Sequence, residues 1–310
     1  MFHGGTSFGW MNGANSDGKN YEPDVTSYDY NAPLDESGRP TRKFYAFRSI
    51  IVEDTARPAI PAPFPAPARP IPEFPLQEAV SLWKVLPTPV HSEHVLSMED
   101  LDQAYGYILY RKQLNGPKEG ELVLDELHDY AQVYLSGKLV GTLDRRLAQN
   151  HLRLKVPSAG AQLDLLVENS GRINFGIALR GERKGITKQV TLADKALLGW
   201  DIFPLPMTEP WKLPFAPTTC QGPCFYRGAF VAGASADMFL DTRNFTKGMV
   251  WLNGRPLGRI WSIGPQQTLY VPGPWLRPAE NEVIVFDLNG QSGETLQGRD
   301  HPILDSTPAQ

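Results

Sequence analysis

Short runs in which apolar and polar residues alternate fill most of the chain after residue 76. A first group comprises "YGYILYRKQL", "GELVLDEL", "AQVYLSGKLVGTL", "HLRLKV" and "AQLDLLVEN", and a second comprises "FYRGAFV", "DMFLDT", "GMVWLNGRPLGRIW", "QTLYVP" and "NEVIVFDLNG". Glycine, asparagine or proline interrupts these runs roughly every 8 to 12 residues, as in antiparallel sandwiches. Because alternation puts one face of each strand into a core, the pattern predicts a mainly β protein.

The two groups of predicted strands repeat one another. "VYLSGKLVG" (133–141) and "VWLNGRPLG" (250–258) share Val, Leu, Gly, a basic residue and a final Gly at matching offsets. Their Ser-Gly and Asn-Gly pairs favour two-residue hairpin turns, which need positive φ angles. Further on, "LKVP" is matched by "LYVP", and "LDLLVEN" by "VIVFDLN". We therefore predict two β-sandwiches of similar plan, at 79–200 and 224–291, with a connector at 201–223 and a tail at 292–310.

The start of the chain follows another pattern, which predicts one strand, one long loop and one helix over 1–55. "MFHGG" is a short apolar run, and "NGANSDGKN" is a polar stretch rich in turn residues. In "TRKFYAFRSIIVED" the spacing of Phe44, Phe47, Ile50 and Ile51 predicts one face of an amphipathic helix. Because a lone parallel strand has no partner, a unit of this kind belongs to a larger parallel sheet or barrel.

A proline-rich stretch, "ARPAIPAPFPAPARPIPEFP", separates this unit from the strands. Proline lacks the backbone N–H that a strand ladder needs, and repeated prolines favour an extended, semi-rigid spacer. We place a linker at 56–78, which is the clearest domain boundary in the sequence.

Composition narrows the class of partner. The chain has 310 residues, a formal net charge of −4, and 30 Lys and Arg against 34 Asp and Glu. Without a basic run, this balance argues against nucleic acid and against electrostatic attachment to a membrane. No apolar stretch approaches the roughly 20 residues that span a bilayer, and no signal peptide is recognisable at the start. Localisation is left open, and Cys220 and Cys224 could form a small disulfide ring or remain reduced.

No complete active site is recognisable. Adjacent carboxylates such as Asp35 and Glu36, or Asp125 and Glu126, cannot both point at one substrate from a strand, because neighbours face opposite sides. His91 and His94 have no further metal ligands nearby in the sequence, so we expect no metal site and no cofactor. We interpret the remaining acidic candidates as solvated surface groups; they are Glu22, Asp24, Asp29 and Asp129.

Aromatic residues are the stronger candidates for a binding role. They follow the first predicted strand, where a barrel strand would carry substrate contacts at its carboxyl end. An aromatic face packs well against the C–H side of a pyranose. Alternatively, these rings fill the junction between barrel and helix, and Trp261 is either a sugar platform or part of a sandwich core. The cluster consists of Phe8, Trp10, Tyr21, Tyr28 and Tyr30.

The same segments resemble a known family. "MFHGGTSFGWMNGAN" and "VTSYDYNAPLDESGRPTRKFYAFRSI" resemble the last strand, loop and helix of the catalytic (β/α)8 barrel in family 35 glycoside hydrolases, the β-galactosidases of the lysosomal type. "FYRGAF", "FTKGMVWLNGRPLGRIWSIGPQQTLYVPGPWL" and "NEVIVFDL" resemble that family's galactose-binding-like jelly-roll sandwich. "GYILYRKQL" and "LHDYAQVYLSGKLVGTLDRR" resemble the sandwich that precedes it.

The resemblance has consequences for single residues. In such enzymes both catalytic glutamates lie on earlier barrel strands, so it implies a C-terminal portion that lacks both and is inactive alone. Tyr30 in "SYDY" matches a residue that contacts galactose, and Tyr28 and Asp29 match its supporting neighbours. Trp10 is a weaker candidate for a substrate contact. The family usually has Asp where this chain has Asn31.

For the parent enzyme, the resemblance implies retaining hydrolysis of terminal β-galactosyl residues without a metal or organic cofactor. Its partner would be a galactoside or a galactose-containing polysaccharide, and its location periplasmic or extracellular. The alternative is a free-standing carbohydrate-binding module whose sandwiches hold a polysaccharide by exposed aromatic side chains.

Overall fold

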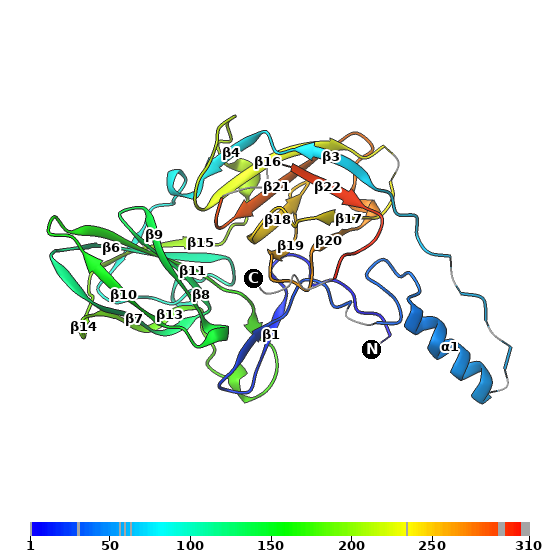
Figure 1. Ribbon diagram of the computed structural model, residues 1–310, viewed down its shortest axis with the longest axis horizontal. Coiled ribbons are helices and arrows are strands. Elements are labelled where there is room, and N and C mark those ends of the chain that lie inside the picture. Colours follow the sequence, from blue (N-terminus) through cyan, green and yellow to red (C-terminus); the bar gives the residue numbers. More distant parts are fainter. Residues whose placement is uncertain are drawn as a thin grey trace. The chain divides into compact units, whose positions relative to one another are not determined.

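The computed structural model describes residues 2–29, 32–55, 57–58, 60–62, 64–233, 235–290 and 295–304. The protein is mainly β, as the sequence predicts, and its strands form two sandwiches (Figure 1). The chain divides into two compact units. Unit 1 comprises Met1–Asn12, Val25–Val85 and Glu209–Gln310, and unit 2 comprises Gly13–Asp24 and Leu86–Thr208.

Unit 2 contains the first predicted sandwich. Its two main sheets have the strand orders β5-β15-β6-β11-β8-β9 and β10-β7-β13-β14. Alternate residues such as Leu163, Leu165 and Val167 are buried and form the core with residues of the facing sheet such as Leu122 and Leu124. The strands are β5 (Val90–Ser92), β6 (Tyr107–Leu114), β7 (Lys118–His128), β8 (Tyr130–Leu135), β9 (Lys138–Asp144), β10 (His151–Val156), β11 (Ala161–Glu168), β13 (Gly185–Leu192), β14 (Lys195–Ala196) and β15 (Trp200–Leu205).

Unit 1 contains the second sandwich. Its sheets have the orders β19-β18-β21-β16-β4 and β20-β17-β22-β3. Val250, Leu252, Val283 and Val285 from one sheet and Leu240 from the other are buried in its core. The strands are β3 (Ile71–Pro75), β4 (Glu78–Ser81), β16 (Cys224–Val231), β17 (Met238–Asp241), β18 (Lys247–Leu252), β19 (Arg255–Trp261), β20 (Thr268–Val271), β21 (Glu280–Asp287) and β22 (Thr295–Arg299).

The two predicted hairpins are confirmed and have the same geometry. Between β8 and β9 the turn residues Ser136 and Gly137 have φ angles of 49° and 79°, and between β18 and β19 Asn253 and Gly254 have 51° and 77°. Positive φ at both positions is the two-residue turn that suits the twist of a hairpin. Each hairpin also shifts register at the equivalent point, between Val133 and Tyr134 in one and between 250 and 251 in the other.

Some strands lie in segments that the sequence pattern assigned to connections. β3 and the start of β4 fall within 56–78, β15 overlaps 201–223, and β22 falls within 292–310. β3 is the last strand of its sheet, and an edge strand tolerates proline because one side of it forms no ladder. Pro72 and Pro75 are therefore compatible with a strand.

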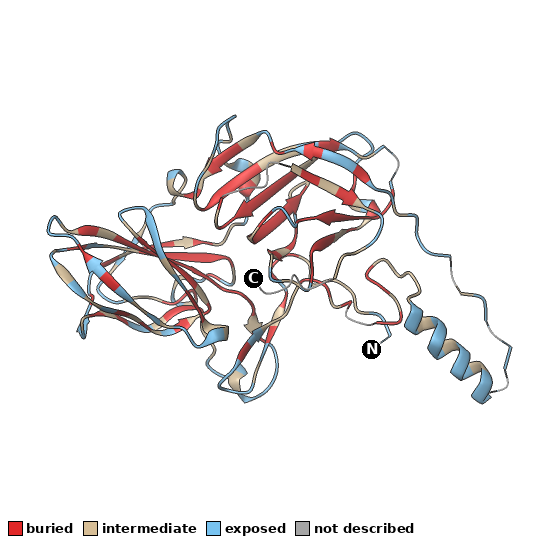
Figure 2. Ribbon diagram, in the orientation of Figure 1, coloured by how far each residue is buried: buried red, intermediate tan, exposed pale blue. Residues whose placement is uncertain are grey.

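The N-terminal segment differs in part from its prediction. The predicted helix is present as α1 (Arg42–Thr55), with none of its residues buried (Figure 2). The predicted strand over "MFHGG" appears in the described residues only as a parallel bridge between His3 and Leu34, because a parallel strand needs neighbours that this segment does not meet. The predicted loop instead contains the antiparallel pair β1 (Gly13–Ser16) and β2 (Tyr21–Pro23), and β1 also pairs with β12 (Arg172–Ile173) in unit 2.

The structure also shows the state of the two cysteines and the character of the helices. Cys220 and Cys224 are joined by a disulfide bond. Within the described ranges, α1 is too short and too polar to cross a bilayer, and no other helix qualifies.

Candidate functional site

The loop at 26–36 is built against the first residues of the chain. The Ser7 amide donates to the Thr26 carbonyl oxygen at 2.8 Å, and the Tyr28 amide donates to the Gly5 carbonyl oxygen at 2.9 Å. A Cβ atom on Gly4 would lie 2.1 Å from the Tyr28 carbonyl oxygen. Only glycine permits so close an approach of two backbones, so the "HGG" stretch fixes where this loop lies.

The sequence candidates for substrate contact have different placements in this loop. Tyr30 and Asn31 lie outside the described residues. Tyr28 is half-buried. Asp29 is 5% exposed, and its amide donates to Ser27 Oγ at 3.1 Å. The contacts of Asp29 are those of a residue that holds the loop, and the roles of Tyr28, Asp29 and Tyr30 in substrate binding remain predictions.

Two buried carboxyl groups shape the electrostatics of the loop. Asp29 Oδ2 accepts from the Glu36 amide at 3.3 Å, and Glu36 Oε1 accepts from Thr6 Oγ1 at 2.6 Å. Burial, with the nearby Asp35 carboxylate, raises the pKa of Asp29 to about 7. Burial likewise raises the pKa of Glu36 to about 7. Both groups therefore change protonation near neutral pH, unlike solvated carboxyl groups.

The loop is anchored to the edge strand β19 of unit 1 and to Gln266, which lies between β19 and β20. The Arg259 amide donates to Thr26 Oγ1 at 3.0 Å, and the Ser27 amide donates to Gln266 Oε1 at 2.8 Å. A Cβ atom on Gly258 would lie 2.4 Å from Thr26 Cγ2. Thr26 and Ser27 are each 1% exposed. The second sandwich thus fixes the segment that leads directly to Tyr30.

Trp10 lies in the same contact with β19. Its side chain is 7% exposed, the Arg259 guanidinium lies 4.6 Å from its ring centroid, and its ring meets Trp251 edge to face at 6.3 Å. Phe8 packs nearby against Trp275 at 4.5 Å. Both rings therefore pack against the second sandwich, whereas the predicted alternative placed them at the junction between barrel and helix. A part for Trp10 in sugar binding remains a prediction, and so does one for the half-buried Trp261, whose ring centroid lies 3.5 Å from Lys247 Nζ.

Tyr21 belongs to a buried ionic cluster in unit 2. Its hydroxyl lies 2.9 Å from Asp129 Oδ2, and the ammonium of Lys184 lies 2.7 Å from the same oxygen and 2.8 Å from Glu182 Oε1. The Arg145 guanidinium donates to Asp129 Oδ1 at 2.8 Å and stacks 4.4 Å from the Tyr21 ring centroid. Despite burial, these cations hold the pKa of Asp129 below its usual range.

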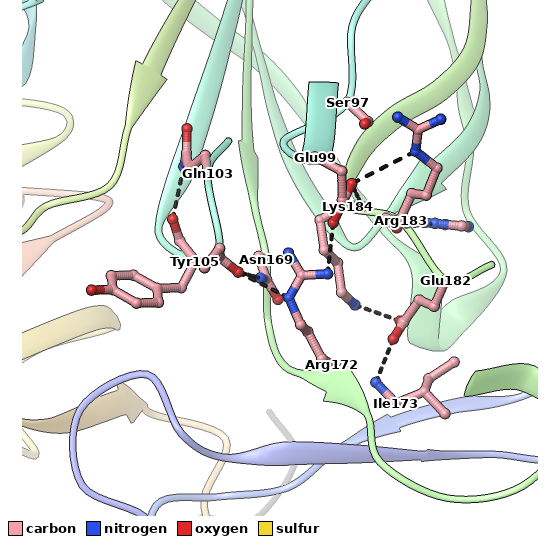
Figure 3. A network of polar contacts seen from close by, with 12 residues as sticks. Ser97, Glu99, Gln103, Tyr105, Asn169, Arg172, Ile173, Glu182, Arg183 and Lys184 are labelled. Carbon is pink, nitrogen blue, oxygen red and sulfur yellow. Dashed lines mark hydrogen bonds and ion pairs between the residues drawn. The ribbon is translucent and has the colours of Figure 1, made fainter. Parts of the chain in front are cut away.

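Further polar contacts adjoin Lys184 and Glu182 of that cluster (Figure 3). Arg172 Nη1 lies 2.6 Å from Glu99 Oε1, and the Lys184 amide donates to Glu99 Oε2 at 3.0 Å. Glu182 Oε2 accepts from the Ile173 amide at 2.5 Å, which ties β12, the partner strand of β1, to the cluster. The network therefore secures the hairpin β1–β2 to the first sandwich. Sequence reasoning missed it because its members are far apart in the chain.

The interpretation as solvated surface groups is wrong for Asp29 and Asp129, which are both buried. The other acidic candidates serve local structure. Asp35 Oδ1 accepts from the amides of Ser37 and Arg39, both at 2.9 Å, and closes a turn. Asp125 pairs with the exposed Lys188 at 3.1 Å, and Glu126 Oε2 accepts from Thr187 at 2.9 Å. Among the described residues, no three His, Cys, Asp or Glu side chains gather closely enough to hold a metal ion.

Three family descriptions match successive parts of the chain. Residues 1–53 match glycosyl hydrolases family 35, residues 95–206 match the first all-beta domain of beta-galactosidase, and residues 223–281 match the galactose-binding domain of beta-galactosidase. The first match contains the loop at 26–36 and most of α1. The other two correspond to the sandwiches of unit 2 and unit 1.

Curated relatives agree with these matches. A beta-galactosidase of Xanthomonas manihotis is 45% identical over 289 residues, with 91% of this chain and 47% of the relative covered. The beta-galactosidase-1-like protein 3 of Homo sapiens is 40% identical, with 98% and 48% covered. The chain thus spans about half the length of these relatives. A Pleurotus ostreatus lectin structure, 12% identical with a TM-score of 0.24 over 72% of this chain and 80% of the lectin, is too dissimilar to support an argument. On these matches, the chain belongs to the family 35 glycoside hydrolases of the β-galactosidase type.

Proposed function

We propose that this chain is the C-terminal part of a β-galactosidase that removes terminal β-galactosyl residues with retention of configuration. In this proposal both catalytic carboxylates lie on an upstream part of the enzyme, and the 310 residues alone do not hydrolyse galactosides. The observation that carries the proposal is the match of residues 1–53 to family 35 together with the incomplete packing of that segment.

The apolar face of α1 supports an upstream partner. Phe47, Ile50 and Ile51 are 46%, 62% and 59% exposed, and Phe2 beside the helix is 61% exposed. Phe2, Phe47 and Ile51 border, together with residues of the spacer, a cavity of about 450 Å³. An amphipathic helix normally buries such a face, and the remaining elements of a (β/α)8 barrel would cover it.

The chain's own residues would then act by positioning. The contacts of Thr26 with β19 and of Ser27 with Gln266 hold the segment before Tyr30, and Asp29 secures the same loop from inside. Tyr30 would contact the galactose, as the family resemblance implies. Hydrolysis with retention needs an acid and a nucleophile about 5–5.5 Å apart. The described carboxylates near this loop are buried or close turns, which supports placing both catalytic groups upstream.

A complementation experiment tests the proposal. The 310-residue chain is assayed on a chromogenic β-galactoside alone and after co-expression with the upstream half of the Xanthomonas manihotis relative. We expect no turnover alone and turnover in the complex. Ile50→Glu on the exposed face of α1 should abolish complementation, whereas Glu53→Gln, an exposed residue of the same helix, should not. Turnover by the chain alone would overturn the proposal.

The carbohydrate-binding module stays as a second candidate on one observation, the match of residues 223–281 to a galactose-binding domain. A module of the kind predicted from sequence would hold polysaccharide by exposed aromatic rings. Calorimetry of the 310-residue chain with a plant galactan separates the two functions. Tight galactan binding without complementation would favour the module.

A further inference from the structure

Unit 1 carries a row of polar side chains on the outer face of the sheet β20-β17-β22-β3. Asp241 ends β17 and is the register partner of Gln297 on β22, and Glu73 lies on the adjacent strand β3. Successive side chains of a strand point to opposite faces. The row therefore faces away from the core, because each member adjoins a buried core residue of its own strand, namely Leu240, Leu296 and Phe74.

These side chains border a cavity of about 510 Å³, within the usual range of small-molecule sites, about 300–1,000 Å³. A second cavity of about 310 Å³ shares Gln297 and continues along β22 to Arg299. Between them β22 and β3 shift register, at Leu296 and Gly298, and such irregularities often re-aim side chains at binding sites. The first cavity is lined by Glu73, Asp241, Arg243, Asn244, Thr295 and Gln297.

Asp241 holds two guanidinium groups in place here. It is 6% exposed, and it accepts from Arg243 Nε at 2.9 Å, Arg243 Nη2 at 2.7 Å and Arg299 Nε at 2.6 Å. Although burial opposes ionisation, these bonds hold the pKa of Asp241 below its usual range. A guanidinium has five N–H donors, so each Arg keeps donors for a ligand in a fixed orientation.

The chemistry of the lining defines the ligand class. Arg243, Arg299 and the Gln297 amide supply donors. The exposed Glu73 carboxylate supplies acceptors and has no hydrogen bond or ion pair to any residue that the structure describes. Across the two cavities two arginines stand against three carboxylates, because Asp300 also lines the second one, and this excess of negative charge disfavours an anion. Neutral hydroxyl groups fit best, because each one both donates and accepts.

The geometry points to a saccharide-binding site in these two adjoining cavities, with consecutive neutral sugar units lying along β22. This site lies on strands of the second sandwich and is separate from the loop that carries Tyr30. It goes beyond the proposed function and does not depend on an upstream catalytic part. Among the described residues, no Phe, Tyr or Trp side chain lines either cavity. We therefore expect millimolar affinity for a single sugar and tighter binding of an oligosaccharide.

Saturation-transfer NMR and calorimetry on the 310-residue chain test this site with galactose, lactose and a galactan-derived oligosaccharide. Arg243→Ala and Glu73→Ala should each raise the Kd about fivefold or more, a loss of about 1 kcal/mol. The control is Arg180→Ala, an exposed arginine of unit 2, which should leave the Kd unchanged. Thermal unfolding followed by circular dichroism verifies that the variants fold.

Three results would overturn this inference. The first is no binding of any of the three sugars, and the second is equal binding by wild type and both pocket variants. The third is a stronger calorimetric response when sodium sulfate replaces the sugar as the probe. If Arg243→Ala fails to fold, Glu73→Ala decides the matter alone, because Glu73 is exposed and its removal disturbs no internal contact. Failure of complementation would bear only on the proposed function.

Discussion

The ammonium of Lys184 lies 2.7 Å from Asp129 Oδ2 in a site that is closed to solvent, since Lys184 is 0% exposed and Asp129 1% exposed. The same carboxylate oxygen contacts the hydroxyl of Tyr21. This pair therefore joins the hairpin β1–β2, which belongs to the family 35 segment, to the body of the first sandwich. A buried carboxylate such as that of Asp129 strongly destabilises the folded state when its cationic partner is removed.

Replacing Lys184 by Met should lower the free energy of unfolding by about 3–5 kcal/mol, because Asp129 and Glu182 would lose a buried countercharge. Urea unfolding of the 310-residue chain measures the change. Lys188→Met is the matched control. Lys188 pairs with Asp125 at 3.1 Å on the surface, where such a pair contributes about 0–1 kcal/mol. Equal effects of the two variants would contradict a special role for the buried cluster.

The repeated hairpins give a second prediction. Gly137→Ala and Gly254→Ala should each destabilise the chain by about 1 kcal/mol or more, because both glycines have φ angles near +80° and alanine is strained there. Ser136→Asn should be neutral or stabilising, since asparagine suits the first turn position better. Denaturant midpoints measure all three. A larger loss for Ser136→Asn than for Gly137→Ala would refute this account of the turn.

The hairpins were predictable because their determinants are local. Positive φ at Gly137 and Gly254 and the alternation around them are properties of a few neighbouring residues. The strand β3 could not be predicted in this way. Its prolines are tolerated only at the edge of a sheet, and which strand lies at an edge depends on the whole topology. The hairpin β1–β2 was missed for a similar reason. β1 pairs with β12, and Tyr21 of β2 contacts Lys184, so both contacts join distant parts of the sequence.

The candidate site shows the same division. Tyr28, Asp29 and Tyr30 could be named from a short motif, but the environment of Asp29 could not. Its burial and the approach of Glu36 arise from Gly4, Thr6 and the β19 edge. The polar pocket had no sequence signal at all, because Glu73 and Asp241 are far apart in the chain.

Limited trypsin treatment should cut first between residues 42 and 49, at sites such as Arg42, Lys43 and Arg48. α1 has no buried residue, and exposed backbone with few contacts opens readily. The N-terminal fragment should remain bound after cleavage, because Thr26 and Ser27 are hydrogen-bonded to the second sandwich. Gel filtration of the cut protein followed by mass spectrometry shows whether it does. Release of the fragment would mean that these contacts are weak.

The pair Asp29 and Glu36 predicts a pH dependence with a definite sign. Both pKa values are raised to about 7 in the folded chain, whereas carboxyl groups in an unfolded chain titrate near 4. Between these values the folded state binds more protons than the unfolded state. This contribution to stability is thus fully present below about pH 4 and is lost as the pH rises through about 7.

Asp29→Asn should remove part of this dependence and stabilise the chain at pH 8 by about 1 kcal/mol or more, because a neutral amide pays no penalty for burial without a countercharge. Urea unfolding at pH 4.5, 6 and 8, followed by tryptophan fluorescence, gives the two profiles. Glu22→Gln is the control, an exposed residue of β2 that should leave the wild-type profile unchanged. If Asp29→Asn is instead less stable than wild type at pH 8 by the same margin as at pH 4.5, the Asp29 carboxyl is already ionised in the folded chain, and the loop is held by its charge.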